Sequence, residues 1–234
     1  MHTAYHLDFD SKSTQLVLSE EESHHLVKVL RHREGQELEL CNGIGTRGIA
    51  KITLAHPKKC EVELLYSTFE EKSVREIHLA IAPTKNMDRL EWVIEKATEI
   101  GADTITLLHC KNNERKLVKM ERLHKILLSA VKQSKRYYLP QLVDLTPLLT
   151  FIKDNPNGAI AHCYGNDSAK ETIQDWKMNG PVMIGPEGDF TLEEVDYAKK
   201  KGYTTLDLGK NRLRTETAAV FVVSVLTVHC SCNY

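Results

Sequence analysis

The pattern of apolar and polar residues changes near residue 72. Before it, short apolar runs alternate with turn signals, as in small β domains. One helical stretch interrupts these runs, in which Ser19 and Glu22 have the spacing of a capping box ahead of Leu26. The predicted strands are residues 15–18, 37–41, 49–54 and 60–65. This pattern predicts a small β-barrel with one helix over residues 1–72. The domain ends in a charged connector, residues 70–76.

Residues 73–234 follow a different pattern, in which strands and helices alternate. The predicted strands are residues 77–82, 104–108, 159–163, 182–184 and 204–208, and the predicted helices are residues 87–100, 121–134, 147–153 and 191–201. Strands separated by helices imply a mostly parallel sheet covered on both faces. The run 218–228 is apolar apart from Ser224 and Thr227, and its periodicity allows either a helix or a strand. The second domain is therefore predicted to be α/β.

Two turns rich in glycine and charge flank the helix at 191–201. The first, residues 185–189, reads Gly-Pro-Glu-Gly-Asp, and the second, residues 208–217, reads Leu-Gly-Lys-Asn-Arg-Leu-Arg-Thr-Glu-Thr. Thr191 and Glu194 form a capping-box pattern, and Gly202 occupies the position of a left-handed helix end. Each turn thus follows a strand, at the sheet edge where open α/β proteins bind ligands. We expect one pocket between them.

Composition narrows the class of protein. Apolar residues make up 41% and charged residues 27%, as in ordinary soluble proteins. No apolar run reaches transmembrane length, and the N-terminus lacks the features of a secretory signal. The six cysteines contain no Cys-x-x-Cys pair, which favours reduced thiols in a cytoplasmic protein without metal. A metal held by His229, Cys230 and Cys232 is the weaker alternative.

Positive charge is local, because the net charge is only −1. Residues 111–136 contain nine Lys or Arg residues against two Glu residues, which suits a phosphate backbone, although a solvated helix face would have the same composition. A second motif, Gly-x-Gly-x-x-Gly at residues 43–48, precedes a predicted strand. Dinucleotide binding requires a helix there, so we expect a hairpin turn.

The two turns carry a family resemblance. Ile-Gly-Pro-Glu-Gly at residues 184–188, followed by Leu-Gly-x-x-x-Leu-Arg-Thr-Glu-Thr-Ala at 208–218, resembles the SPOUT class of RNA methyltransferases. Within that class the chain is similar to the RsmE family, which methylates N3 of a uridine in small-subunit (16S) ribosomal RNA. Asp189 stands where a second glycine is usual in the family, and Arg212 replaces an apolar residue.

The resemblance implies an architecture and partners. A PUA-like barrel would precede a SPOUT domain with a trefoil knot, in which the run 218–228 is a helix. The enzyme would act as a homodimer, use S-adenosyl-L-methionine, and modify small-subunit ribosomal RNA or the 30S particle. Ordinary connection rules argue against a knot, which is implied by the resemblance alone. Neither a membrane nor a metal is expected.

The resemblance also implies the cofactor site. The loop after His162 would form one wall of the pocket, and the two turns would form the other walls. Main-chain groups near Leu208, Gly209 and Leu213 would bind the adenine. The full set expected to bind the cofactor is His162, Ile184, Gly185, Glu187, Gly188, Leu208, Gly209, Leu213, Arg214, Thr215, Thr217 and Ala218.

Uracil N3 carries a proton, so catalysis requires its removal or stabilisation of the resulting anion. Glu187 is the candidate base or cofactor-orienting group, and the alternative is an ion pair with Arg214 that joins the turns. Arg214 or Arg136 would stabilise charge on the uracil oxygens, because a guanidinium offers a planar fork of donors.

The residues expected to contact RNA are Arg31, Arg33, Lys85, Arg115, Gln133 and Arg136. For Arg31 and Arg33, favourable interaction with a helix dipole is an equal alternative. Gln133 and Arg136 fit a family Gln-x-x-Arg pattern but would also suit a solvated helix end. Tyr137 or Tyr138 is able to stack on the target base, and core packing is the simpler use of both. Rival functions are the same chemistry on another RNA or base, an RNA-binding protein without catalysis, and a nucleotide-dependent enzyme using residues 43–48.

Overall fold

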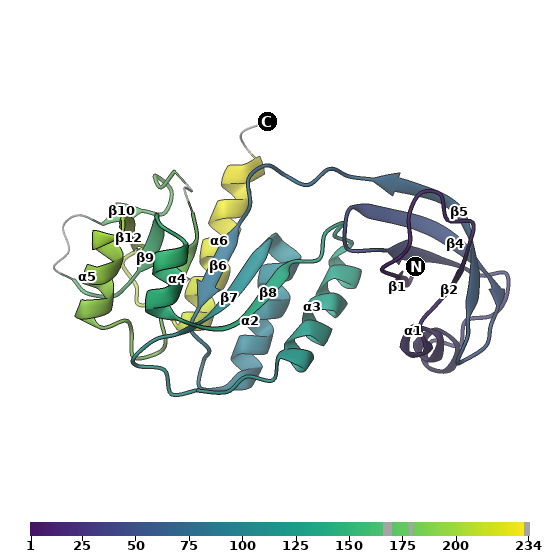
Figure 1. Ribbon diagram of the computed structural model, residues 1–234, viewed down its shortest axis with the longest axis horizontal. Helices are drawn as coiled ribbons and strands as arrows, with labels where there is room; N and C mark the ends of the chain where they lie inside the picture. Colours follow the sequence, from purple (N-terminus) through teal and green to yellow (C-terminus); the bar gives the residue numbers. More distant parts are fainter. Residues whose placement is uncertain (166–169, 178–179, 232–234) are drawn as a thin grey trace. The chain divides into compact units, whose positions relative to one another are not determined.

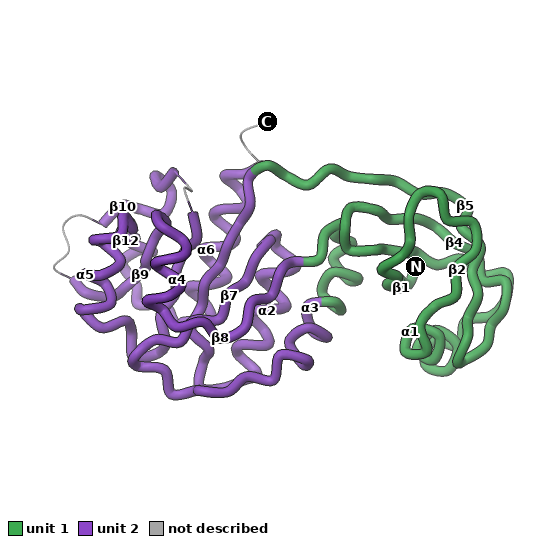
Figure 2. Tube along the Cα trace, in the orientation of Figure 1, with its two compact units in different colours: residues 1–74, 128–139 green, residues 75–127, 140–234 purple. Residues whose placement is uncertain are grey.

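The computed structural model describes residues 1–165, 170–177 and 180–231. The chain divides into two compact units, the first made of residues 1–74 and 128–139 and the second of residues 75–127 and 140–234 (Figure 2). Residues 128–139 had been assigned to the second domain by the sequence. They belong to the first unit because long-range main-chain bonds attach them, including Leu139 N–H to the Gly43 carbonyl at 2.8 Å. No local pattern encodes such contacts.

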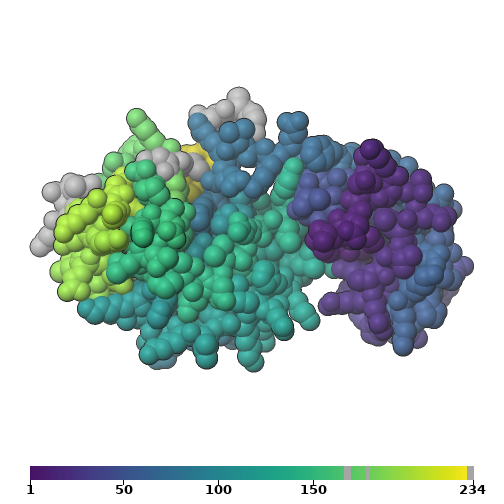
Figure 3. All heavy atoms as spheres, viewed as in Figure 1, coloured from purple at the N-terminus to yellow at the C-terminus, as the bar shows by residue number. Residues whose placement is uncertain are grey.

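The first unit contains a five-stranded sheet with the order β1-β3-β4-β5-β2 (Figure 1). The strands are β1 (Thr3–Tyr5), β2 (Gln15–Val17), β3 (Glu37–Cys41), β4 (Thr46–Leu54) and β5 (Glu61–Phe69). β1 was not predicted, and it pairs parallel with β3, whereas the other pairs are antiparallel. A core that includes Phe9, Leu26 and Leu38 fills this unit. Surface atoms of its N-terminal residues appear in purple and blue in the space-filling view (Figure 3).

The Gly-x-Gly-x-x-Gly motif connects β3 to β4, which pair in an antiparallel register from Glu37↔Lys51 to Cys41↔Arg47. Gly43 and Gly45 have φ values of 72° and 106°, which favour glycine. The prediction of a hairpin is confirmed. A strand follows the motif, so it lacks the helix that a dinucleotide site requires.

The predicted helix near residue 20 consists of α1 (Glu20–His24) followed by a π-helical turn, η1 (His25–Val29). Ser19 Oγ accepts the Glu22 N–H at 3.2 Å, as expected for an N-cap. Glu22 does not return the bond that completes a capping box. Instead, its Oε1 pairs with Lys132 Nζ at 2.7 Å, so a distant partner has replaced the local one.

The second unit contains a seven-stranded sheet in which every pair is parallel, as predicted. Its order is β10-β12-β9-β11-β6-β7-β8. The strands are β6 (His78–Ile81), β7 (Thr104–His109), β8 (Gln141–Pro147), β9 (Gly158–Ala161), β10 (Glu171–Thr172), β11 (Val182–Ile184) and β12 (Tyr203–Asp207). The helices are α2 (Met87–Ile100), α4 (Leu148–Asp154), α5 (Leu192–Lys200) and α6 (Thr215–Ser231), together with the first part of α3 (Met120–Ser134), whose residues from 128 on belong to the first unit. β8 and β10 were not predicted.

Helices cover both faces of this sheet (Figure 1). Met183 of β11 packs in a core cluster with Phe151 of α4 and Val195 of α5. Successive strand residues point to opposite faces, so Val182 and Ile184 point to the side on which α6 contacts β11 and α2 contacts α6. β11 is therefore a fully buried central strand, which explains its uninterrupted apolar sequence.

The ends of the last two helices follow local signals. The Thr191–Glu194 capping box is complete, and Gly202, at φ 88°, follows the end of α5. The apolar run 218–228 is part of the helix α6, which settles the ambiguity in its periodicity. Within the described residues, no helix combines the length and apolar character needed to cross a bilayer.

Candidate ligand pocket at the carboxyl edge of the sheet

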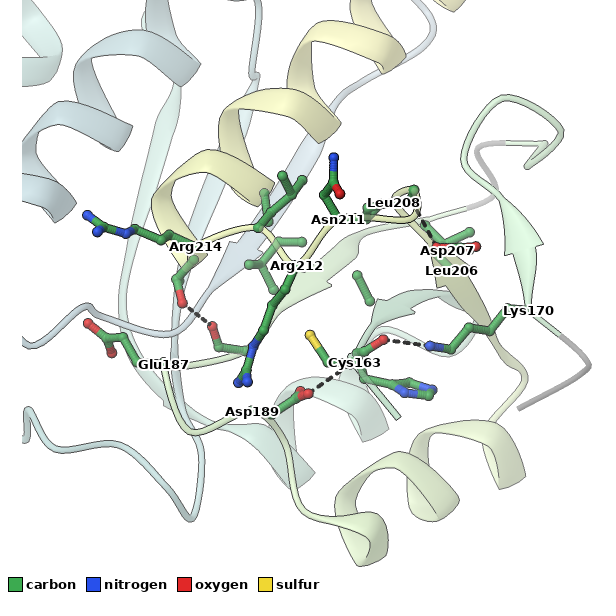
Figure 4. Close-up of a pocket in the computed structure, with 18 of the residues that line it drawn as sticks. Cys163, Lys170, Glu187, Asp189, Leu206, Asp207, Leu208, Asn211, Arg212 and Arg214 are labelled. Carbon is green, nitrogen blue, oxygen red and sulfur yellow. Dashed lines mark hydrogen bonds between the residues drawn. The ribbon is translucent and has the colours of Figure 1, made fainter. Parts of the chain in front are cut away.

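The segments that follow β9, β11 and β12 border one cavity of about 790 Å³ (Figure 4). β9 pairs with both β11 and β12, so the carboxyl ends of the three strands meet at one edge. The predicted cofactor residues that line the cavity are His162, Ile184, Gly185, Glu187, Leu208, Gly209, Leu213, Arg214, Thr215 and Ala218. Gly188 and Thr217 do not line it.

The set expected to bind the cofactor did not include several other lining residues: Ala161, Cys163, Gly165, Lys170, Pro186, Asp189, Leu206, Asp207, Lys210, Asn211 and Arg212. Asp207 and Lys170 carried no motif. Asp189 and Arg212 were visible as departures from the family pattern, but the sequence did not assign them to the site.

The first turn packs tightly against the start of the next segment. A Cβ atom at Gly185 would lie 3.0 Å from Phe190 Cδ2 and 3.2 Å from the Phe190 main-chain nitrogen. These distances are tighter than most side-chain contacts, which explains glycine at this position. Thr215 Oγ1 donates to the Gly185 carbonyl at 3.1 Å, so the first residue of α6 fastens one turn to the other.

Asp189 has a φ of 64°, in the left-handed region that favours glycine and tolerates aspartate. This conformation explains why glycine is usual there in the family. The carboxylate also contributes contacts that glycine lacks. Oδ2 accepts the Cys163 N–H at 2.8 Å, and Oδ1 accepts the Phe190 N–H at 2.8 Å. Asp189 thereby joins the loop after β9 to the first turn.

Glu187 and Arg214 both border the cavity (Figure 4). The ion pair considered as the alternative role of Glu187 is not formed. Glu187 Oε1 accepts the Lys85 main-chain N–H at 2.9 Å. Arg214 Nη1 lies 4.0 Å from Glu216 Oε1, and its side chain is 70% exposed. Glu187 and Arg214 therefore contact different groups, and both border the cavity.

The second turn has fewer attachments. Asp207 Oδ1 accepts the Gly209 N–H at 2.9 Å within the turn. Gly209 has a φ of 115°, and no heavy atom lies within 4 Å of the position of its missing Cβ. The side chain of Arg212 extends from this turn toward Asp189 on the opposite side of the cavity (Figure 4).

Charge within the cavity is mixed. Glu187, Asp189 and Asp207 contribute carboxylates, and Arg212 and Arg214 contribute guanidinium groups. Such a lining suits a ligand that carries charges of both signs.

Cys163 also lines the cavity but is a poor candidate nucleophile. Burial raises the pKa of its thiol above the usual range, and Asp189 raises the pKa further, against an opposing effect of Arg212. The group is therefore a thiol at neutral pH, whereas attack would require a thiolate.

The predicted RNA-contacting residues fall into both units. Lys85 and Arg115 lie in the second unit, where Lys85 donates its N–H to Glu187. The first unit contains the others, namely Arg31, Arg33, Gln133 and Arg136. Arg136, a candidate for catalysis, is thus placed within a different unit from Glu187 and Arg214. Its catalytic role and all the RNA contacts stay predictions.

Tyr137 and Tyr138 have structural partners. Tyr137 Oη lies 3.1 Å from Thr68 Oγ1, and Tyr138 Oη donates to the Glu70 carbonyl at 2.7 Å. For metal binding, no cluster of three or more His, Cys, Asp or Glu residues suited to a metal occurs in the part of the chain that the structure describes. The alternative at His229 and Cys230 includes Cys232, which lies outside the described residues.

The fold and cavity define a class of protein: a parallel α/β domain with a ligand site at the carboxyl edge, accompanied by a small β unit. Family comparisons identify that class. Residues 70–227 match an RNA methyltransferase domain, and residues 18–65 match an RNA methyltransferase PUA domain. The chain belongs to this family of RNA methyltransferases.

Curated relatives agree with the family. The chain is 34% identical over 173 residues to a Mesomycoplasma hyopneumoniae protein named ribosomal RNA small subunit methyltransferase E, covering 70% of this chain and 73% of that protein. It is 29% identical over 224 residues to the Bacillus subtilis protein of the same name, covering 88% and 87%.

Solved structures share the complete fold. A probable rRNA methyltransferase from Porphyromonas gingivalis has a TM-score of 0.87 at 33% identity, and the match covers 100% of both chains. A putative methyltransferase from Legionella pneumophila, solved with its bound cofactor SAM, has a TM-score of 0.87 at 30% identity and 97% coverage of both chains.

Proposed function

We propose that this protein methylates N3 of a uridine in small-subunit ribosomal RNA and takes the methyl group from S-adenosyl-L-methionine. The observation that carries the proposal is that both motif-bearing turns border one cavity, with Glu187 and Arg214 in its lining. The name shared by the relatives supports the RNA substrate. The SAM-bound Legionella structure supports the cofactor.

The cavity fits this cofactor chemically. Its volume of about 790 Å³ lies within the usual range for small-molecule sites. S-adenosyl-L-methionine carries a positive sulfonium and ammonium together with a negative carboxylate. The carboxylates of Glu187, Asp189 and Asp207 complement the positive groups, and the guanidinium groups of Arg212 and Arg214 complement the negative one.

We assign the remaining predicted residues to the same site. Main-chain groups near Leu208, Gly209 and Leu213 would bind the adenine, and glycine allows the backbone to approach it closely. His162, Ile184, Thr215 and Ala218 line the cavity and would contact the cofactor. Gly188 and Thr217 do not line the cavity, so they would affect cofactor binding indirectly, through the shape of the turns that contain them.

The bound cofactor would supply an activated methyl group, because its sulfonium sulfur takes the electron pair of the breaking S–C bond as N3–C forms. The protein must then hold the acceptor base in line and receive the N3 proton. Within the described residues Glu187 Oε1 is bonded to Lys85 and Oε2 has no hydrogen-bond partner, so we assign proton removal to Oε2. Arg214 or Arg136 would stabilise the developing charge on the uracil oxygens.

The finer architecture is part of the proposal. We place the protein in the SPOUT class, with a PUA-like barrel and a trefoil knot near the C-terminus, on the strength of the resemblance. A homodimer is supported by the apolar residues Phe221 and Val228 of α6, of which Val228 is 58% exposed. The expected setting is the cytoplasm, and the expected RNA contacts are Arg31, Arg33, Lys85, Arg115, Gln133 and Arg136.

The test combines binding and product analysis. Isothermal titration calorimetry measures binding of S-adenosyl-L-methionine to the purified protein. Small-subunit ribosomal RNA is isolated from a strain that lacks the gene and is incubated with protein and cofactor. Mass spectrometry then compares the modified nucleosides of this RNA before and after incubation. The proposal predicts binding and the appearance of one N3-methyluridine. Methylation of another base or of another RNA would contradict the target, and the absence of both cofactor binding and methylation would contradict enzymatic function.

A further inference from the structure

Three loops at the carboxyl edge of the second unit's sheet are tied to one another by side chains. They follow β6, β7 and β11, and comprise residues 82–86, 110–119 and 185–191. β6 pairs with both β7 and β11, so the loops start from neighbouring strands. Only the third carries the motif expected to bind cofactor, whereas the first two carry Lys85 and Arg115.

The peptide groups around Lys85 are held from two sides. Glu187 Oε1 accepts the Lys85 N–H at 2.9 Å. Arg115 donates through Nη2 to the Lys85 carbonyl and through Nε to the Thr84 carbonyl, the latter at 3.3 Å. We call residues 185–191 the cofactor turn and residues 110–119 the basic loop. The Glu187 carboxylate of the cofactor turn and the Arg115 guanidinium of the basic loop thus hold the Lys85 segment between them.

The basic loop is attached to the cofactor turn directly as well. Asn112 Nδ2 donates to the carbonyls of Gly188 and Asp189 at 3.2 and 3.0 Å. The Lys111 N–H donates to Glu194 Oε1 at 2.8 Å. The three loops therefore form one cross-braced surface, in which Glu187 supplies the attachment of the Lys85 segment to the turn.

The cations on this surface are accessible to a polyanion. Lys85 Nζ pairs with Glu114 Oε2 at 2.8 Å, with 72% and 57% of the two side chains exposed, and this contact raises the Lys85 pKa. Exposed pairs of this kind contribute little stability, so a phosphate group is able to replace Glu114. Arg115, which is half-buried, uses two of its five N–H groups on main-chain carbonyls, which leaves three as possible donors to a phosphate oxygen.

We propose that Glu187 is a positioning residue that fixes the Lys85 segment through Oε1, so that Lys85 and Arg115 present a preformed site for an RNA phosphate beside the cofactor pocket. This inference rests on the proposed function and deepens it. Without the carboxylate, the segment must be ordered when RNA binds, and the entropic cost weakens the complex. The acceptor oxygen carries this role, rather than the negative charge.

Two substitutions separate the negative charge of Glu187 from its role as a hydrogen-bond acceptor. Glu187→Gln keeps a carbonyl oxygen that accepts the Lys85 N–H, and it removes the charge. Glu187→Ala removes both. Glu193 provides a matched control, since it is an exposed carboxylate close to the same turn that pairs with Lys111 Nζ at 3.2 Å and does not contact Lys85.

The experiment measures the affinity of wild type, Glu187→Gln, Glu187→Ala and Glu193→Ala for in vitro transcribed small-subunit ribosomal RNA, at fixed salt concentration and with saturating S-adenosyl-L-methionine. Thermal unfolding checks that each variant is folded. Glu187→Ala is expected to raise the dissociation constant about tenfold, the scale of one ordinary hydrogen bond. Glu187→Gln and Glu193→Ala are expected to stay within about twofold of wild type.

A double variant tests the shared segment. Because Glu187 and Arg115 act on the same peptide groups, Glu187→Ala combined with Arg115→Ala should weaken RNA binding less than the product of the single effects. Equal weakening by Glu187→Gln and Glu187→Ala would overturn the inference in favour of a charge effect, as would unchanged RNA affinity in Glu187→Ala. If wild-type protein neither binds cofactor nor methylates RNA, the proposed function itself fails, which is a different result.

Discussion

The two turns that border the cavity both carry glycine and charged residues, but they differ in structural support. The first turn, residues 185–189, receives hydrogen bonds from Lys85, Asn112, Cys163 and Thr215, which lie in four other segments. In the described residues, the side-chain bond of Asp207 to Gly209 is local to the second turn, and residues 209–212 are exposed. The first turn is therefore held by several other segments, whereas residues 209–212 of the second turn are exposed and less attached.

The difference follows from the positions of the strands. β11 lies between β9 and β6, so the loops of neighbouring strands surround the turn that follows it. β12 lies between β9 and the two-residue strand β10 near one end of the sheet. Two turns that both contain glycine and charged residues thus become a rigid wall and an adaptable wall of one pocket. A rigid wall orients a ligand, and an adaptable wall is able to close over it.

The largest expected effect concerns Arg214 in the adaptable wall. Arg214→Lys keeps a positive charge but loses the planar fork of donors, so it should lower kcat about 100-fold if the guanidinium stabilises the uracil oxygens. Single-turnover methylation of RNA measures the effect. Cofactor affinity, measured by calorimetry, should change less than threefold.

The matched control is Lys210→Arg, a change of cation in the same exposed turn. Its rate should remain close to that of wild type. A rate for Arg214→Lys equal to that of Lys210→Arg would exclude a role for the guanidinium in the chemical step.

A smaller effect is expected on folding stability when one aspartate in each wall is replaced by alanine. Asp189→Ala removes the acceptors of two main-chain N–H groups and places alanine at a φ of 64°, so it should destabilise folding by about 1–3 kcal/mol. Asp207→Ala removes one local acceptor in an exposed turn and should cost about 0.5–1 kcal/mol. Urea unfolding of both variants, followed by circular dichroism, measures the difference. Equal losses would mean that the first turn is no better supported than the second.

The sequence predicted what depends on local contacts. The Thr191–Glu194 capping box is complete because both partners lie within one turn of helix. The similar pattern at Ser19 and Glu22 succeeded only in part, since Lys132, far along the chain, binds the glutamate. The short strands β1 and β10 exist through pairing with other strands, and their own residues carry little signal.

The same distinction applies to the candidate site. The glycine-bearing turns, and hence most lining residues, followed from motif and strand order. The partner of Glu187 did not, because Lys85 lies 102 residues away and contributes only its main-chain N–H, which every residue except proline possesses. Sequence therefore indicated where the pocket forms, but the attachments of its walls required coordinates.

The smallest expected effects come from two glycines, and they sharpen the contrast between the walls. In Gly185→Ala, the new Cβ would meet Phe190 at 3.0 Å in a turn that cannot move, so the penalty should appear as a loss of about 1–2 kcal/mol in folding stability. In Gly209→Ala, the new Cβ would meet open space, but the φ of 115° disfavours alanine.

Because the second turn is exposed and weakly attached, it should relax in Gly209→Ala and leave folding stability within about 0.5 kcal/mol of wild type. The cost should appear instead when S-adenosyl-L-methionine binds, as an affinity about fivefold weaker, because closing over the cofactor then restores the strained conformation. Urea unfolding and calorimetry on both variants measure the two quantities. A folding loss in Gly209→Ala as large as that in Gly185→Ala would show that both walls are rigid before the cofactor binds.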